Sequence, residues 1–149
     1  MNYWIFQSNP AKFRILDWLR NYGGQIDSWH IGQFKKEVKP GDTVFIWKAK
    51  GNSDIRGIYA KAMVIPMPEK LPLLDIEKNY WIDEAEKERM ANLKLVAIKY
   101  SALHLDKPLL SDDIKKVPEL KDLTIIRTPR QGVHKVELEQ GRIMESMLV

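Results

Sequence analysis

Hydrophobic residues gather in the middle of the chain in two runs that polar turn residues separate. Residues 43–47 read Thr-Val-Phe-Ile-Trp, and residues 57–65 pass from a glycine into a second, longer apolar run. β-Branched and aromatic residues favour strands, whereas Pro-Gly-Asp at 40–42 and Gly-Asn-Ser-Asp at 51–54 favour turns. The pattern predicts a β-hairpin.

The second run of this hairpin alternates small apolar residues with other types. Because side chains on a strand point alternately to its two faces, one face of this strand is entirely apolar. Its residues are Ile58, Ala60, Ala62 and Val64. Small side chains at successive inward positions suit a tightly curved sheet or a small barrel, where interior volume is limited.

A helical pattern precedes the hairpin. Ser-Asn-Pro at 8–10 provides an N-cap and a proline for a first turn, and Gly-Gly at 23–24 ends the segment. Apolar residues recur between these limits with helical spacing, so one face of the helix is buried and Trp18 belongs to the core. They are Ile15, Trp18, Leu19 and Tyr22.

The rest of the chain adds further strands and short helices. The pattern of apolar residues predicts strands at 2–7, 93–101 and 123–127. It predicts helices at 83–90, from 111 to before Pro118, and at 137–148. Gly141 weakens the last of these helices. The prolines between 66 and 72 predict a loop. We therefore expect one α+β domain over residues 1–149, with five or six mostly antiparallel strands in a small curved or closed barrel and short helices around it.

Composition excludes several classes of protein. The chain of 149 residues has no cysteine, so thiolate catalysis, cysteine-based zinc sites and a disulfide-stapled secreted module are excluded. No apolar run is long enough for a membrane span, and the first ten residues lack the layout of a signal peptide. We expect a cytoplasmic protein with no membrane partner.

Charge permits a polyanionic partner. The net charge is +4, with lysines concentrated between 35 and 61 and acidic residues between 83 and 88. Each run, taken singly, is also typical of a solvated surface.

Motifs for catalysis are missing. His30, His104 and His134 lack metal-ligand spacing, and the chain has neither a glycine-rich phosphate loop nor a Gly-x-Ser-x-Gly elbow. The adjacent Asp112 and Asp113 suit the start of a helix better than an acid–base pair. We expect no cofactor, no metal and no catalysis, although a fold can bring distant residues together.

Five tryptophans in so short a chain favour a binding site. Trp4 and Trp18 are expected in the core, and Trp47 suits either the core or a pocket. Trp29 stands between Ser28 and His30, a polar setting that is unusual for a core tryptophan. We predict that Trp29 is partly exposed in a concave pocket.

The order of several segments resembles that of an EVE domain, a member of the PUA-like group related to YTH domains. These segments are Asn-Tyr-Trp-Ile at 2–5, Trp29, Lys-Pro-Gly-Asp-Thr-Val-Phe at 39–45 and Gly-Ile-Tyr-Ala at 57–60. Residues 127–133 resemble the closing Arg-x-Pro-x-Gln-Gly-Thr segment of the family, with Val133 in place of threonine. The resemblance implies a PUA-like fold in which Trp29 lines a pocket for a modified base, with Trp81 as a candidate opposite wall.

The function that this resemblance implies is the non-catalytic reading of a modified base in DNA or RNA, flipped into an aromatic pocket, with methylation as the expected modification. A small hydrolase or nuclease that uses His30 or His134 with a carboxylate is the alternative, and an interaction domain that binds a peptide or metabolite is the third hypothesis. The expected base pocket consists of Trp29, Ser28, His30, Trp47 and Trp81, and the expected phosphate-binding residues are Lys35, Lys36, Lys50, Arg127, Arg130 and Lys135.

Overall fold

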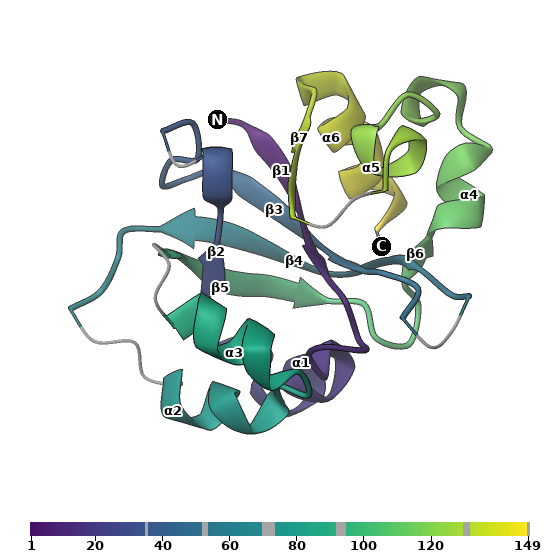
Figure 1. Cartoon of the computed structure of the whole chain (residues 1–149). Coiled ribbons are helices and arrows are strands. Elements are labelled where there is room, and N and C mark those ends of the chain that lie inside the picture. Colours follow the sequence, from purple (N-terminus) through teal and green to yellow (C-terminus); the bar gives the residue numbers. More distant parts are fainter. Residues whose placement is uncertain (35, 52–53, 70–73, 92–94, 130–131, 149) are drawn as a thin grey trace.

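A single curled sheet organises the protein in the computed structural model, which describes residues 1–34, 36–51, 54–69, 74–91, 95–129 and 132–148 (Figure 1). Of the seven strands in the described residues, six follow the order β2-β5-β4-β3-β1-β7, and the seventh, β6, pairs with β4 beside this path. The strands are β1 (Tyr3–Ser8), β2 (Ile26–His30), β3 (Thr43–Lys48), β4 (Gly57–Ile65), β5 (Leu95–Leu103), β6 (Leu109–Leu110) and β7 (Val133–Val136).

The sheet is mixed. β1 pairs in parallel with β3, whereas the other strand pairs are antiparallel. Register shifts lie between Ile46 and Trp47 in the β3–β4 pair and between Lys61 and Ala62 in the β4–β5 pair. Such irregularities increase the local twist of a sheet, so they fit its strong curl.

The predicted hairpin is confirmed in β3 and β4, and the predicted alternation of β4 holds from Ala60 to Val64. Ala60, Ala62 and Val64 are each at most 1% exposed and pack into one hydrophobic core, while Met63 on the other face is 45% exposed. The predicted place of Ile58 on the same face as Ala60 was wrong. Ile58 lies with Trp47 in the core on the opposite face, because the register of the β3–β4 pair shifts beside it.

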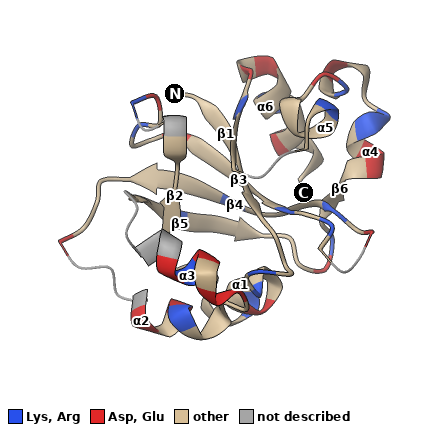
Figure 2. Cartoon of the chain, viewed as in Figure 1, with Lys and Arg blue, Asp and Glu red and all other residues tan. Residues whose placement is uncertain are grey.

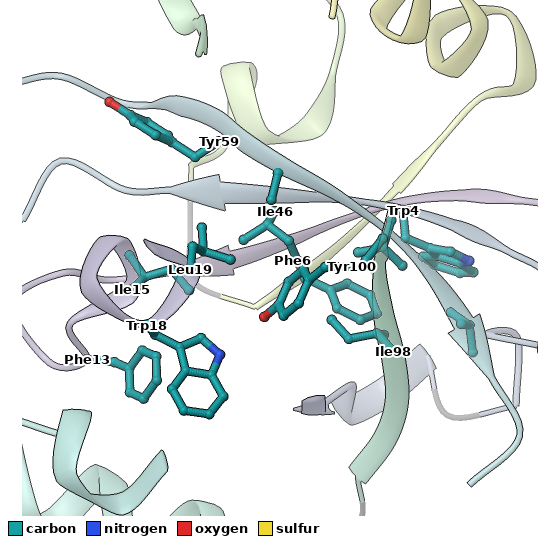
Figure 3. Close-up of a cluster of buried hydrophobic side chains, with 14 of the residues drawn as sticks. Trp4, Phe6, Phe13, Ile15, Trp18, Leu19, Ile46, Tyr59, Ile98 and Tyr100 are labelled. Atoms are coloured by element: carbon teal, nitrogen blue, oxygen red, sulfur yellow. The ribbon is translucent and has the colours of Figure 1, made fainter. Parts of the chain in front are cut away.

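Two hydrophobic cores lie on opposite faces of the sheet. Trp4 and Phe6 of β1 enter the first core with residues of α1 (Ile15–Tyr22), as Figure 3 shows, and Tyr3 and Ile5 enter the second. The second core also takes residues from the helices that follow β6. The alternation of side chains along β1 thus ties both cores to one strand.

Short helices cover the two faces. Helices α1, α2 and α3 lie on one side of the sheet, and α4, α5 and α6 lie on the other (Figure 1). Within the described part of the chain, no helix is long and apolar enough to cross a bilayer. The remaining helices are α2 (Leu74–Glu77), α3 (Glu84–Ala91), α4 (Ser111–Lys115), α5 (Thr124–Arg127) and α6 (Leu138–Met147), with 3-10 turns η1 (Gly32–Phe34), η2 (Lys78–Tyr80) and η3 (Pro118–Leu120).

The structure corrects three local predictions. The first helix begins at Ile15, because Asn9 instead closes a turn in which its Oδ1 accepts a hydrogen bond from the Ala11 amide at 2.9 Å. The segment 123–127, predicted as a strand, forms helix α5, since a short β-branched run does not separate the two states. Strands β2, β6 and β7 were not predicted, and β1 and β3 are parallel.

Gly141 in α6 has a packing role that its low helix propensity conceals. A Cβ atom at this position would lie 2.2 Å from Cγ of Tyr3, so the helix can approach the tyrosine ring only through a glycine. The Tyr3 hydroxyl donates a hydrogen bond to Glu145 of the same helix, and Lys61 Nζ lies 3.1 Å from Glu145 Oε2. The close approach therefore joins α6 to β1 and β4.

We expect Gly141→Ala to destabilise the protein by about 1 to 3 kcal/mol, because overpacking against Tyr3 outweighs the gain in helix propensity. Urea unfolding at neutral pH measures the change. Glu139→Ala, at an exposed position of the same helix, is the control and should change stability by less than about 0.5 kcal/mol. A Gly141→Ala protein more stable than the parent would contradict the packing role.

Candidate nucleic-acid interface

A pocket of about 1130 Å³ is bounded by both edge strands of the curled sheet. β2 and β7 line it together with the end of β1, and the turn at 9–13, helix α3 and segments beside α2 and α5 complete its wall. β2 and β7 stand at opposite ends of the strand order, so they line one pocket only because the sheet curls and brings its two edges together.

Trp29 is the aromatic residue of β2 in this pocket. It is half-buried, it pairs with Val96 of β5, and its ring centroid lies 5.7 Å from that of Phe6. The prediction of a partly exposed Trp29 in a concavity is confirmed, and Trp18 is fully buried as expected. Ser28 and His30, its neighbours in sequence, line the same pocket.

Trp81 also lines the pocket, from the segment after η2. Its backbone forms an isolated antiparallel bridge with Phe13, and the two ring centroids lie 4.8 Å apart. The next residue is anchored as well, since the Ile82 amide donates to the carbonyl of Lys12 at 2.7 Å. Trp81 thus both covers the first core and contributes a pocket wall.

Trp47 does not line the pocket, and its expected place there was wrong. The side chain is 1% exposed and lies in the second core with Phe45 and Ile58. On β3 it shares a face with Phe45, and that face is covered by the helices that follow β6. Its role is structural.

A buried carboxylate, Asp27, underlies the pocket wall at Ser28. Asp27 Oδ2 accepts hydrogen bonds from Trp18 Nε1 at 2.9 Å and from the Tyr100 hydroxyl at 2.5 Å, and Oδ1 accepts from the Ser28 amide at 2.7 Å. Burial raises the pKa of Asp27, and these three donors oppose the rise because they favour the charged form. The network fixes the start of β2 on the core.

Glu77, at the end of α2, is a pocket residue that the sequence did not reveal. Ser28 lines the same pocket. Burial, and then the nearby charge of Asp27, raise the pKa of Glu77 to about 9, while Ser28 works against this rise. Glu77 therefore carries a proton at neutral pH. A glutamate in a short helical segment is typical of surface, so no pattern distinguished it.

Gln7 adds a further polar group to the pocket wall. Its Oε1 is buried and, among the described residues, accepts no hydrogen bond. Buried polar atoms without partners are uncommon and costly, so the environment of Gln7 Oε1 calls for an explanation.

A family comparison identifies the fold. A model of the EVE domain matches residues 2–147. The chain belongs to the EVE domain family. No curated protein matches the sequence. The predicted PUA-like α+β fold is confirmed by this assignment and by the curled sheet.

Solved structures share the fold of this EVE domain at low sequence identity. A hypothetical protein from Leishmania major has a TM-score of 0.67 and 22% identity, and the match covers 99% of this chain and 94% of that chain. Human THYN1 in complex with 5-methylcytosine containing DNA has a TM-score of 0.66 and 15% identity, with coverages of 99% and 97%. A protein from Pseudomonas syringae has a TM-score of 0.65 and 17% identity, with 99% of both chains covered.

The expected phosphate-binding residues of this EVE domain lie at different distances from the pocket. Lys135 on β7 lines it, with Nζ 5.9 Å from the ring centroid of Trp4. Arg127 is exposed at the end of α5, where it pairs with Asp122 at 3.8 Å. Lys36 and Lys50 are exposed and do not line the pocket. Lys35 and Arg130 lie outside the described residues.

Other charged residues of the EVE domain line the pocket without having been predicted. Figure 2 shows acidic and basic residues interspersed on α3, which forms one side of the rim. Lys12 Nζ lies 3.6 Å from Glu86 Oε1, so part of this charge is paired. The rim is therefore mixed beside α3, while Lys135 contributes a positive charge from β7. The unpredicted charged residues are Lys12, Glu77, Lys78, Glu86, Lys87 and Glu88.

Two of the three histidines reach the pocket. His30 lines it from β2 and His134 from β7, where His134 Nδ1 lies 2.9 Å from the Thr124 hydroxyl. His104 is not among the lining residues. In the portion of the chain that the structure describes, no group of three or more histidine, aspartate or glutamate side chains is placed to hold a metal ion.

Proposed function

We propose that this EVE domain binds DNA or RNA and holds a flipped, modified base against Trp29 without catalysing a reaction. The observation that carries the proposal is a half-buried Trp29, braced by Phe6, in a large pocket whose wall also contains Ser28 and the half-buried Glu77. Family membership and the structural similarity to a protein solved with 5-methylcytosine containing DNA support it.

The aromatic wall suits a base because every nucleobase has a π-face, and stacking contributes about 1 to 3 kcal/mol per base. A buried methyl group adds only about 1 kcal/mol, so discrimination between bases also requires polar groups on the pocket wall. Ser28, His30 and Glu77 line the pocket and can provide such groups. Trp81 is the proposed second aromatic wall.

Phosphate contacts must offset the cost of flipping a base, which is a few kcal/mol in a duplex. Of the expected phosphate-binding residues that the structure describes, Lys135 and Arg127 are the nearest to the pocket, because Lys135 lines it and Thr124 and Thr128 near Arg127 also line it. The proposed set is completed by Lys36 and Lys50 and by Lys35 and Arg130.

Trp29→Ala tests the proposal directly. We expect it to weaken binding to an oligonucleotide with one 5-methylcytosine by about 1 to 3 kcal/mol and to change binding to the unmodified strand far less. Fluorescence anisotropy titrations measure both affinities. Ile82→Ala, an exposed apolar residue outside the pocket, is the control and should change neither. A thermal melt of each variant verifies folding.

Lys135→Ala should give the opposite pattern in the same titrations. It should weaken modified and unmodified strands by a similar factor and reduce the salt slope by about one unit, since a phosphate contact releases counterions regardless of sequence. Equal losses for both strands in Trp29→Ala would show that no base is read at Trp29, and would favour an interaction domain for a peptide or metabolite.

A hydrolase or nuclease is the second candidate, because His30 and His134 line the same pocket as Glu77 and Glu86. This candidate predicts turnover of an oligonucleotide or nucleotide that His134→Ala abolishes. Binding without any cleavage by the parent protein would favour the reader.

A further inference from the structure

One part of the sheet surface beside α6 is exposed and apolar. On this face Phe45 of β3 is fully buried in the second core, and Lys61, its partner on β4, is paired with Glu145 of α6. The neighbouring pair, Thr43 and Met63, lies on the same face because alternate residues of a strand share a face. Met63 is 45% exposed, so the helical cover of this face ends between the two pairs.

Methionine is the main residue type of this surface, which we call the methionine strip and define as Met1, Thr43, Met63 and Lys99. Met1 is exposed, and its Sδ lies 3.9 Å from the Thr43 hydroxyl. Lys99 of β5 is the partner of Met63 on the side away from β3. Exposed apolar side chains that gather in one place mark interaction sites, and the unbranched side chain of methionine adapts to the shape of a partner.

A partner must contact the methionine strip through side chains. β3 pairs with β1 and β4, β4 pairs with β3 and β5, and β5 pairs with β4 and β2. Each strand under the strip therefore has a neighbour on both sides, so an added strand finds no open edge there. An amphipathic helix that lays its apolar side across the strands meets this requirement.

The charges beside the methionine strip favour an acidic partner. Lys99 is exposed within the strip. Lys39 is exposed in the adjoining turn, where the Gly41 amide donates to the carbonyl of Val64 at 2.8 Å. Among the described residues, neither lysine takes part in an ion pair. Two copies of the strip would bring like charges together, whereas carboxylates around an apolar centre complement it.

We infer that the methionine strip binds an acidic amphipathic helix of another protein. Apolar side chains of that helix pack on Met1 and Met63, and its carboxylates pair with Lys39 and Lys99. Trp29 packs against the first core, on the opposite face of the sheet, so the strip and the base pocket do not overlap. The inference is therefore independent of the proposed function.

NMR of the protein with isotope-labelled methionine methyl groups tests this inference. The probe is a synthetic peptide of about five helical turns, with leucine at i, i+3, i+4 and i+7 and with glutamate and alanine elsewhere. A second peptide has lysine in place of each glutamate. We expect the acidic peptide to shift the Met63 signal until saturation, while the signal of Met144, which is fully buried in the second core, stays unchanged.

Fluorescence anisotropy of the labelled peptides measures the affinities. At low salt the acidic peptide should bind about 10-fold more tightly than the basic one, because the exchange of glutamate for lysine turns attraction to two lysines into repulsion. Met63→Glu should weaken the acidic peptide by about 10-fold and Lys99→Glu by about 3-fold. Ile82→Glu, at an exposed apolar position outside the strip, is the control and should leave the affinity unchanged. A thermal melt verifies that each variant is folded.

Four results would each overturn the inference. The first is a Met63 signal that the acidic peptide does not shift, and the second is equal affinity for the two peptides. The third is a Met63 signal that moves with protein concentration alone, which would assign the methionine strip to a second copy of the chain. The fourth is an equal shift of Met63 by a short single-stranded oligonucleotide, which would assign the strip to nucleic acid.

Discussion

Asp42→Ala should lower the free energy of unfolding by about 3 to 5 kcal/mol, since it leaves three donors without their acceptor. Asp42 is 2% exposed in the turn before β3. Its Oδ1 accepts from the Asn2 amide at 2.9 Å, and its Oδ2 accepts from Trp4 Nε1 and from the Lys39 amide, each at 2.9 Å. One carboxylate thereby joins the turn to the start of β1. Chemical unfolding at neutral pH measures the loss.

Two further variants sharpen this prediction. Asp42→Asn keeps one accepting oxygen and should cost about half as much. Asp54→Ala, at an exposed position in the other turn of the same hairpin, should change stability by less than about 0.5 kcal/mol. An Asp42→Ala protein as stable as the parent would mean that the three donors find other partners.

Glu77→Gln should stabilise the protein increasingly as pH rises from 4.5, by about 3 kcal/mol at pH 7. The pKa of Glu77 is raised from 4.5 to about 9 by burial and by the charge of Asp27. The unfolded chain releases the Glu77 proton above pH 4.5, whereas the folded protein holds it up to about pH 9. The stability that this proton contributes is therefore complete below pH 4.5 and is lost as pH rises towards 9. Glutamine has no proton to release, so the variant avoids this loss.

Urea unfolding at several pH values between 4.5 and 8 measures the difference between the two proteins. Glu119→Gln at an exposed position should show no such growing difference. A Glu77→Gln effect that stays constant across this range would show that Glu77 is ionised in the folded protein. The loss of stability that we expect for the protein at neutral pH is typical of a titratable residue whose pKa is shifted for function.

Local patterns predicted the central hairpin because its signals lie within one stretch of sequence. The turn at 40–42 and the alternation of β4 from Ala60 to Val64 are properties of adjacent residues, and both are confirmed, whereas the pattern did not reveal the register shift that places Ile58 in the other core. The parallel pairing of β1 with β3 and the edge positions of β2 and β7 depend on contacts between distant segments. Periodicity does not encode such contacts, so the sheet order could not be predicted.

The candidate site was predictable only where a residue was unusual in its own setting. Trp29 stood out by its polar neighbours and by the family resemblance, and its place in the pocket is confirmed. The place of Trp47 was ambiguous, because alternation along the strand predicted which face it shares with Phe45 but not that helices cover this face. Glu77, Lys12 and Gln7 have ordinary surroundings in the sequence, and only the curl of the sheet brings them to Trp29.

The pairing of β1 with β7 bears on how the protein is made. Tyr3 is registered with Val136, so one side of the first strand stays unpaired until residues 133–136 have been synthesised. During translation the nascent chain carries an open strand edge, which is a template for pairing with other chains. Since β7 also lines the pocket, the complete pocket forms only after residues 133–135 have been synthesised. A ribosome-bound precursor that lacks this strand has no finished binding site.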